Sequence, residues 1–268
     1  FWILLTVVVC FFLYLYMIMP NTSRRSKILP YLKRDYAHRG LHDSSRLIPE
    51  NSMPAFREAV KQNLAIELDI HLTRDGKVFH DESLKRICNA EGTVEDSTFD
   101  ALQHLYLSGT SEHMPLFSDV LRYVNGRVPL LIELKLPDSN MKLCPAAWDI
   151  LKDYKGPYMV QSFNSLGIRW FHKHAPQVLR GQLSSALTRT NPENPFLARF
   201  CVQFLLTNLI CRPDFISYKL ADAGNPSVWL NHYLYRIPMA VWTLRNQKAY
   251  KTARNKYDMY IFEGFSVK

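Results

Sequence analysis

The sequence of 268 residues predicts an α/β fold: a closed barrel of alternating strands and helices behind one apolar N-terminal helix. After residue 34, short apolar runs alternate with longer amphipathic runs, which is the pattern of repeated strand–helix units. One such barrel typically takes about 250 residues, close to the length available here. Polar side chains follow several of the short apolar runs, where the carboxyl ends of parallel strands would meet.

The first 19 residues are uncharged and almost wholly apolar. Roughly 20 such residues cross a bilayer core, so we expect a transmembrane anchor over residues 1–19. A cleaved signal peptide is the alternative, but its apolar core usually has about 7–15 residues and an A-x-A-like site follows it. This segment ends Met19-Pro20-Asn21 without such a site.

A basic linker over residues 20–34 separates the expected anchor from the barrel, residues 35–268. The formal charge is +9, and the linker supplies five of these charges with no acid, which leaves +4 for the rest. By the positive-inside rule we expect a single-pass membrane protein with a cytoplasmic catalytic domain. No stripe of bases interleaved with aromatics is present, so we expect no nucleic-acid partner. The five cysteines are scattered without CxxC spacing, which favours reduced thiols over disulfides or a zinc site.

The candidate strands are residues 35–37, 66–70, 130–134, 159–162, 179–183, 215–218, 239–243 and 259–262. The first barrel helix is expected over residues 52–62, with Asn51 or Ser52 as its N-cap. Residues 83–125 are long for one connection, so we expect an excursion there and a helix over 116–124. For the apolar stretch 195–211 we favour a barrel helix with a broad buried face; the alternative is an interfacial helix on the membrane.

Acidic and basic side chains collect at the predicted carboxyl ends of the strands. Glu67 and Asp69 lie two apart on one strand, so both side chains point to the same face. Two adjacent carboxylates repel each other unless a cation lies between them, and hard divalent metals prefer oxygen ligands. The predicted barrel mouth carries His38, Glu67, Asp69, Glu133, Lys135, Gln161 and Trp242.

Short motifs lie in one order along nearly the whole chain after residue 35. They are His38-Arg39-Gly40, Pro49-Glu50-Asn51-Ser52, Ile66-Glu67-Leu68-Asp69, Leu72-Thr73-Arg74-Asp75-Gly76, Phe79-His80-Asp81, Glu133-Leu134-Lys135, Gln161-Ser162-Phe163 and Val241-Trp242-Thr243. In these motifs the chain resembles the glycerophosphodiester phosphodiesterase family, of the bacterial membrane-anchored type. Glu263 stands where aspartate is common in that family, and Ile87-Cys88 replaces threonines often found there.

The resemblance implies a TIM barrel that hydrolyses glycerophosphodiesters to sn-glycerol 3-phosphate and an alcohol. By position it implies that Glu67, Asp69 and Glu133 bind one divalent cation, Mg²⁺ or Ca²⁺. In this family the neighbouring glycerol hydroxyl is thought to attack phosphorus, which gives a cyclic phosphate that water then opens.

The resemblance also assigns catalytic roles. His38 and His80 would be the general acid and base, and Arg39 would hold the phosphate. Imidazole titrates near neutral pH, so two histidines on opposite sides of phosphorus can divide the proton transfers. Substrate contacts are expected from Lys135, Gln161 and Trp242, although Trp242 could equally serve core packing alone.

Two other functions stay open. A lysophospholipase D would act on lipids that keep one acyl chain, and the expected anchor makes such substrates accessible. A non-catalytic barrel would only bind phospholipid head groups. The sequence does not indicate whether the protein is a monomer or an oligomer.

Overall fold

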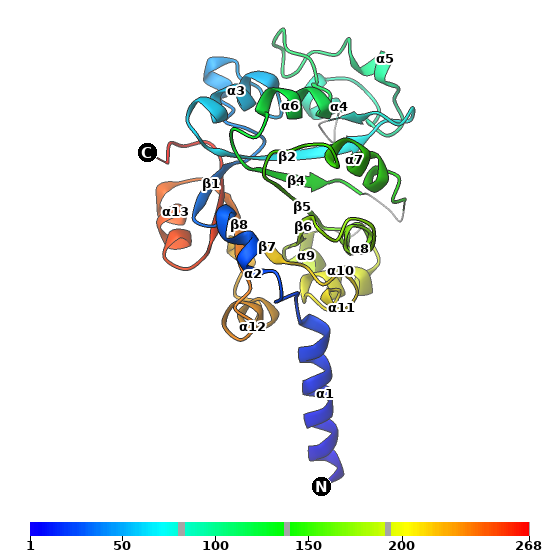
Figure 1. The fold of residues 1–268 in the computed structure, drawn as a ribbon, viewed down its shortest axis with the longest axis vertical. Coiled ribbons are helices and arrows are strands. Elements are labelled where there is room, and N and C mark those ends of the chain that lie inside the picture. The colour runs from blue at the N-terminus through cyan, green and yellow to red at the C-terminus, as the bar shows by residue number, and fades with distance from the viewer. Residues whose placement is uncertain (80–83, 137–139, 191–193, 268) are drawn as a thin grey trace.

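The computed structural model describes residues 1–79, 84–136, 140–190 and 194–267. Within these ranges, eight parallel strands form a closed barrel (Figure 1). They are β1 (Arg34–Ala37), β2 (Ala65–Leu72), β4 (Leu130–Leu134), β5 (Tyr158–Ser162), β6 (Leu179–Ser184), β7 (Phe215–Lys219), β8 (Met239–Leu244) and β9 (Met259–Phe262). The order is β1-β9-β8-β7-β6-β5-β4-β2, and β1 closes the ring by pairing with β2 in the register Tyr36↔Ala65. The predicted barrel and its eight strands are therefore confirmed.

Helices surround the barrel (Figure 1). Those that follow the strands include α3 (Met53–Lys61), α6 (Phe117–Val124), α7 (Leu143–Leu151), α8 (Ser165–His174), α9 (Leu187–Thr190), α10 (Phe196–Gln203), α11 (Asn208–Cys211), α12 (Pro226–Tyr233) and α13 (Gln247–Arg254). The first of these matches the helix predicted over residues 52–62. Ser52 is its N-cap, and its side chain accepts a hydrogen bond from the Ala55 backbone N–H.

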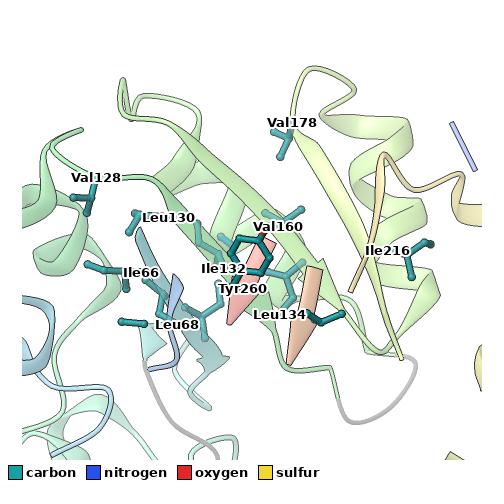
Figure 2. Close-up of a cluster of buried hydrophobic side chains, with 14 of the residues drawn as sticks. Ile66, Leu68, Val128, Leu130, Ile132, Leu134, Val160, Val178, Ile216 and Tyr260 are labelled. Carbon is teal, nitrogen blue, oxygen red and sulfur yellow. The ribbon is translucent and has the colours of Figure 1, made fainter. Parts of the chain in front are cut away.

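Two hydrophobic clusters fill the two faces of the barrel wall. The outward-facing residues, such as Ile66, Leu130 and Val160, pack against the helices (Figure 2). The inward-facing residues at the amino ends of the strands form a separate cluster that contains Tyr36, Leu131, Met159, Leu179, Phe215, Ala240 and Met259. This inner cluster fills the lower half of the barrel, so polar side chains further along the same strand faces lie at the mouth.

The expected excursion between β2 and β4 is present. It contains β3 (Val78–Phe79), which pairs antiparallel with the end of β2, and the short helices α4 (Leu84–Cys88) and α5 (Phe99–Leu102). A small core of its own, which includes Leu84, Val94 and Leu107, stabilises it. The helix expected over 116–124 begins at Phe117 and ends at Val124.

The N-terminal segment forms α1 (Trp2–Ile18), which projects away from the barrel beside α11 and α12 (Figure 1). It occupies the segment predicted as an anchor. Among the described residues, no helix combines the length and hydropathy that crossing a membrane requires. The linker continues as α2 (Arg25–Ile28) and a 3₁₀ turn, Leu29–Tyr31, and Ile28 is buried in the inner cluster of the barrel.

The apolar stretch 195–211 differs from the favoured prediction of one helix with a broad buried face. The chain turns at Leu205, where φ is +56°, so the stretch forms the two short helices α10 and α11. No residue of α10 is buried, and Phe196 and Leu197 are 62% and 71% exposed. Two short helices cannot present one continuous apolar face to the barrel, which leaves these side chains outside.

Candidate active site

Three carboxylates meet at the mouth of the barrel. Glu67 and Asp69 lie on the inward face of β2, and the strand register places Glu133 of β4 beside Asp69. All three residues are buried, and one oxygen atom of each lies within 4.8 Å of the others. The sequence argument about strand faces predicted this grouping.

The electrostatics of this trio fit a divalent cation. Burial raises the pKa of Glu67, and the charge of Asp69 raises it further. For Glu133, burial outweighs the opposing charge of Lys135 and raises the pKa to about 7. The ionised form of these carboxylates is therefore disfavoured unless a cation lies between them. Three carboxylate oxygens at this spacing suit Mg²⁺ or Ca²⁺.

Two basic side chains also contact the carboxylates. Lys135 Nζ lies 2.5 Å from Glu133 Oε1 and 3.3 Å from Asp69 Oδ1. Arg39 Nε lies 3.0 Å from Asp69 Oδ2, and its Nη1 donates to Glu50 Oε1 at 2.6 Å. Both predicted phosphate-binding cations therefore lie at the mouth.

His38 follows β1 and lies between two acidic residues. Its Nδ1 is 2.5 Å from Glu263 Oε2, and its Nε2 is 4.0 Å from Glu67 Oε2. The other Glu263 oxygen, Oε1, accepts from Arg245 Nε at 2.5 Å. If Nδ1 carries the proton that Glu263 accepts, Nε2 is left to exchange a proton with a substrate beside the carboxylates.

These contacts also set the pKa values. Burial lowers the pKa of His38, but the hydrogen bond with Glu263 and the charge of Glu67 raise it by more, so the net shift is upward. Burial raises the pKa of Glu263, yet the hydrogen bonds from His38 and Arg245 bring it down to about 2. The Glu263 carboxylate is therefore ionised throughout the physiological range.

Two further predicted residues line the same region. Gln161 is the register partner of Glu133, and its Nε2 donates to Glu67 Oε1 at 3.3 Å. Trp242 is partly buried, packs against the inner cluster and meets the Phe163 ring edge-on at a centroid distance of 5.7 Å. Its indole N–H has no hydrogen-bond partner among the described residues. Trp242 thus contributes to packing, and its indole N–H is available to donate a hydrogen bond to a substrate.

Direct contacts join seven of the nine residues predicted for the site, and an eighth, Trp242, packs against the inner cluster of the same barrel. The ninth, His80, lies outside the described residues, so its predicted role stays a prediction. Sequence reasoning missed the roles of Glu263, which contacts His38, and Glu50, which contacts Arg39 and, at 2.5 Å, Arg86 Nη2. Glu263 directly follows the last predicted strand, and a polar residue at the carboxyl end of a barrel strand could have been assigned to the mouth on that ground.

Comparison with known proteins gives the same family. The sequence profile of the glycerophosphoryl diester phosphodiesterase family matches residues 38–268. The chain is 32% identical over 158 residues to a glycerophosphodiester phosphodiesterase of Bacillus altitudinis, with 53% of this chain and 63% of that protein covered. It is 36% identical over 218 residues to glycerophosphodiester phosphodiesterase 1 of Bos taurus, with 78% and 59% covered. The match thus spans less than two thirds of the length of these curated relatives.

Solved structures share the fold. A glycerophosphodiester phosphodiesterase from Parabacteroides distasonis has a TM-score of 0.67 at 19% identity, and the match covers 86% of this chain and 92% of that one. A phosphodiesterase from Oleispira antarctica, solved with the product sn-glycerol-3-phosphate, has a TM-score of 0.68 at 20% identity, with 87% and 94% covered. With a profile that matches from His38 onward and a mouth built as that family's motifs predict, the chain belongs to the glycerophosphoryl diester phosphodiesterase family.

Proposed function

We propose that this protein hydrolyses glycerophosphodiesters to sn-glycerol 3-phosphate and an alcohol. The observation that carries the proposal is the placement of His38, held by Glu263, 4.0 Å from one of three clustered carboxylates. A proton-transfer group beside a cation site is what cleavage of an anionic phosphodiester requires. The names of the relatives that match the chain support the same reaction.

The residues at the mouth have separate tasks in this proposal. Glu67, Asp69 and Glu133 would hold one Mg²⁺ or Ca²⁺ ion, which would offset the negative charge of the phosphate. Arg39 and Lys135, released from their carboxylate partners when the cation is bound, would contact the remaining phosphate oxygens.

His38 Nε2 would transfer a proton on one side of phosphorus, and His80 would do so on the other. With the neighbouring glycerol hydroxyl as nucleophile, one histidine would accept its proton and the other would donate a proton to the leaving alcohol. This gives a cyclic phosphate, which water then opens to sn-glycerol 3-phosphate while the two histidines exchange roles. Gln161 and Trp242 would orient the glycerol moiety and the alcohol head group, respectively.

The test is hydrolysis of glycerophosphocholine by the full chain with Mg²⁺ or Ca²⁺, with enzymatic detection of sn-glycerol 3-phosphate. His38→Ala and His80→Ala should each reduce turnover by at least about 100-fold, the usual contribution of general acid–base catalysis. His104→Ala, at an exposed histidine away from the motifs, should keep wild-type turnover. Head-group binding without hydrolysis by the wild-type chain would instead favour the non-catalytic barrel.

A lysophospholipase D activity is the second candidate, favoured by the exposed apolar side chains of α1 and α10. A lipid that keeps one acyl chain stays at a membrane surface, where such side chains would bring the barrel. Release of choline from lysophosphatidylcholine carried in phosphatidylglycerol vesicles, compared with release from glycerophosphocholine, decides between the two substrates.

We further propose that α1 attaches the protein to a membrane, with the barrel on the cytoplasmic side. Support comes from the uncharged sequence of α1 and the five basic residues of the linker that follows it. Co-sedimentation of the full chain with vesicles tests the attachment, and protease access in sealed membranes tests the side.

A further inference from the structure

We propose that the barrel itself has a bilayer-contacting face, formed by exposed apolar side chains of α10, α11 and α12. This face, called the apolar collar below, includes Phe196, Leu197, Leu209, Ile210, Trp229 and Tyr233, which are each between 36% and 71% exposed. The inference rests on the proposed membrane attachment through α1 and is independent of the phosphodiesterase chemistry.

Two of the three helices that form the collar, α11 and α12, contact the base of α1. Tyr14 on α1 hydrogen-bonds through its hydroxyl to Ser227 Oγ of α12 at 2.7 Å. Asn208 of α11 donates from Nδ2 to the Ile18 carbonyl at 2.7 Å, and Ile18 is fully buried. These contacts fix α1 against α11 and α12, as Figure 1 shows. A membrane into which α1 inserts would therefore also lie close to the collar.

A bilayer fits α1 better than a protein partner does. Residues 1–13 are all exposed, and α1 carries no charged side chain on any face. A protein partner would cover one stripe of such a helix and leave the rest in water, whereas lipid covers every face at once. A helix that is apolar all round and not inside a protein core is typical of a membrane environment.

The charges next to the collar complement an anionic lipid surface. Residues 194–212 and 226–236 contain no Asp or Glu, but they contain Arg199, Arg212 and Arg236. Arg212 Nη1 donates to the Met19 carbonyl at 2.7 Å, which places this guanidinium at the end of α1 nearest the barrel. Basic residues near such a surface strengthen binding to anionic lipid.

The aromatic side chains of the collar strengthen this assignment. Trp229 and Tyr233 lie one turn apart on α12 with ring centroids 5.3 Å apart, and both are about half exposed. Tryptophan and tyrosine are enriched where the apolar core of a membrane meets water. The same ring pair is poorly placed in bulk water, where it exposes apolar area without a partner.

The collar reaches the rim of the barrel mouth. Ser184, the last residue of β6, donates to the Val202 carbonyl of α10 at 2.9 Å, and Tyr218 near the end of β7 donates to the Gln203 carbonyl at 2.9 Å. Both strands end at the mouth, so α10 lies on the rim there. The collar therefore orients this side of the mouth toward the lipid, which is the position in which a lysophospholipid could enter without leaving the bilayer.

An environment-sensitive fluorophore on single cysteines of the full chain tests the collar. The background carries Cys88→Ser and Cys201→Ser, so that native Cys10 on exposed α1 reports the attachment itself. With Cys10→Ser added, Leu197→Cys and Trp229→Cys report the collar. Leu47→Cys is the matched control, because Leu47 and Leu197 are both 71% exposed.

Vesicles of equal parts phosphatidylglycerol and phosphatidylcholine are then added, with and without a lipid-borne quencher. Labels at 10, 197 and 229 should shift to shorter wavelength and be quenched, and the label at 47 should do neither. Hydrolysis of glycerophosphocholine is measured on the same samples and should be unchanged, so a failure of the collar is separable from a failure of the proposed enzyme.

Several outcomes would overturn the collar. A response at residue 10 without one at 197 and 229 would mean that α1 enters lipid and the barrel face does not. No response at any position would remove the attachment on which the collar rests. An equal response at residue 47 would indicate non-specific adsorption. A concentration-dependent shift at 197 and 229 without lipid would identify a second copy of the chain as the occupant.

Discussion

At the scale of single residues, Glu263 determines how the imidazole of His38 is presented. Its carboxylate lies 2.5 Å from Nδ1 and is itself held by Arg245. A carboxylate in this position fixes the tautomer and the ring orientation of a histidine, and it stabilises the protonated form. We therefore regard Glu263 as a positioning residue.

Glu263→Gln should lower kcat with little change in KM, because the altered group does not touch the substrate. Glu263 raises the pKa of His38, so its removal should lower that pKa and move the corresponding limb of the pH–rate profile to lower pH. If His38 acts as the base, the acidic limb of the profile reports its pKa; if it acts as the acid, the alkaline limb does. A lower pKa moves either limb to lower pH. The profile of kcat/KM with saturating metal measures it.

The conservative variant separates charge from packing. Glu263→Asp keeps the carboxylate and should restore the wild-type position of the limb better than the glutamine variant does. An unshifted limb in Glu263→Gln, together with a loss of stability equal in both variants, would reduce Glu263 to a structural role.

Protonation of Glu133 should make metal binding depend on pH. Its pKa of about 7 in the folded, metal-free protein lies above the ordinary value of 4.5. The folded state then binds a proton more tightly than the unfolded state does, so metal-free stability falls as pH rises from 4.5 through 7. A bound cation favours the ionised carboxylate, so it competes with that proton.

The expected result is a larger rise in Tm on adding Mg²⁺ or Ca²⁺ at pH 8 than at pH 5.5, in thermal scans of chelator-treated protein. Glu133→Gln removes one of the three carboxylates, so it should reduce both the size of this rise and its dependence on pH. An equal rise at both pH values in the wild type would contradict the raised pKa, and no rise at either would contradict the cation site.

The site residues differ in how well the sequence predicted them, for a physical reason. Glu67 and Asp69 lie two apart on a strand, so local geometry alone places both at the mouth. Glu263 and His38 are 225 positions apart, and only closure of the barrel through the β1–β9 pairing brings them together. Contacts of that kind depend on the exact register, which no local pattern contains.

At the scale of elements, the turn after β1 positions the mouth. Gly40 has φ of +79°, and an added Cβ would lie 2.9 Å from the Ala55 Cβ and 3.0 Å from the Ala55 carbonyl carbon in α3. The close approach of this turn to α3 requires a residue without a side chain. It also fixes the direction in which His38 and Arg39 leave the strand.

Gly40→Ala should therefore destabilise the protein by more than about 1 kcal/mol from backbone strain, with about 1–3 kcal/mol more from overpacking. Gly76 is the matched control, because its φ is also +79° and nothing lies within 4 Å of its added Cβ. Gly76→Ala should show the backbone part alone. Urea unfolding of both variants measures the difference, and equal losses would refute the packing contribution.

The elements themselves were predictable wherever burial is continuous. Every residue of β4 is buried, and such apolar runs mark strands of parallel sheets. The stretch 195–211 has a similar apolar content, yet its helices leave Phe196 and Leu197 exposed. Composition indicates that a segment avoids water, but it does not distinguish a protein core from another apolar environment.

At the scale of the whole molecule, a buried ion-pair network joins the N-terminal segment to the barrel. Arg24 Nη1 lies 3.1 Å from Asp214 Oδ2, and Asn21 Nδ2 donates to Asp214 Oδ1 at 2.8 Å. Arg180 Nη1, fully buried, lies 3.5 Å from the same carboxylate. Asp214 therefore connects the linker to the amino ends of β6 and β7. Because the linker leads directly into α1, this connection helps to fix the orientation of α1 relative to the barrel.

Asp214→Asn should release this connection. Two guanidinium groups would lose their carboxylate partner, and breaking a buried pair in this way costs about 3–5 kcal/mol. Arg24 would keep only its hydrogen bonds to the Gln177 and Val178 carbonyls. Trypsin should therefore cleave after Arg24 and Arg25 faster than in the wild type, measured on the detergent-solubilised full chain by mass spectrometry. Asp119→Asn, which removes the exposed pair with Arg122, should change neither stability nor cleavage. Wild-type cleavage in Asp214→Asn would mean that the burial of Ile28 and the bonds of Arg24 and Arg25 to barrel carbonyls hold the linker without the ion pairs.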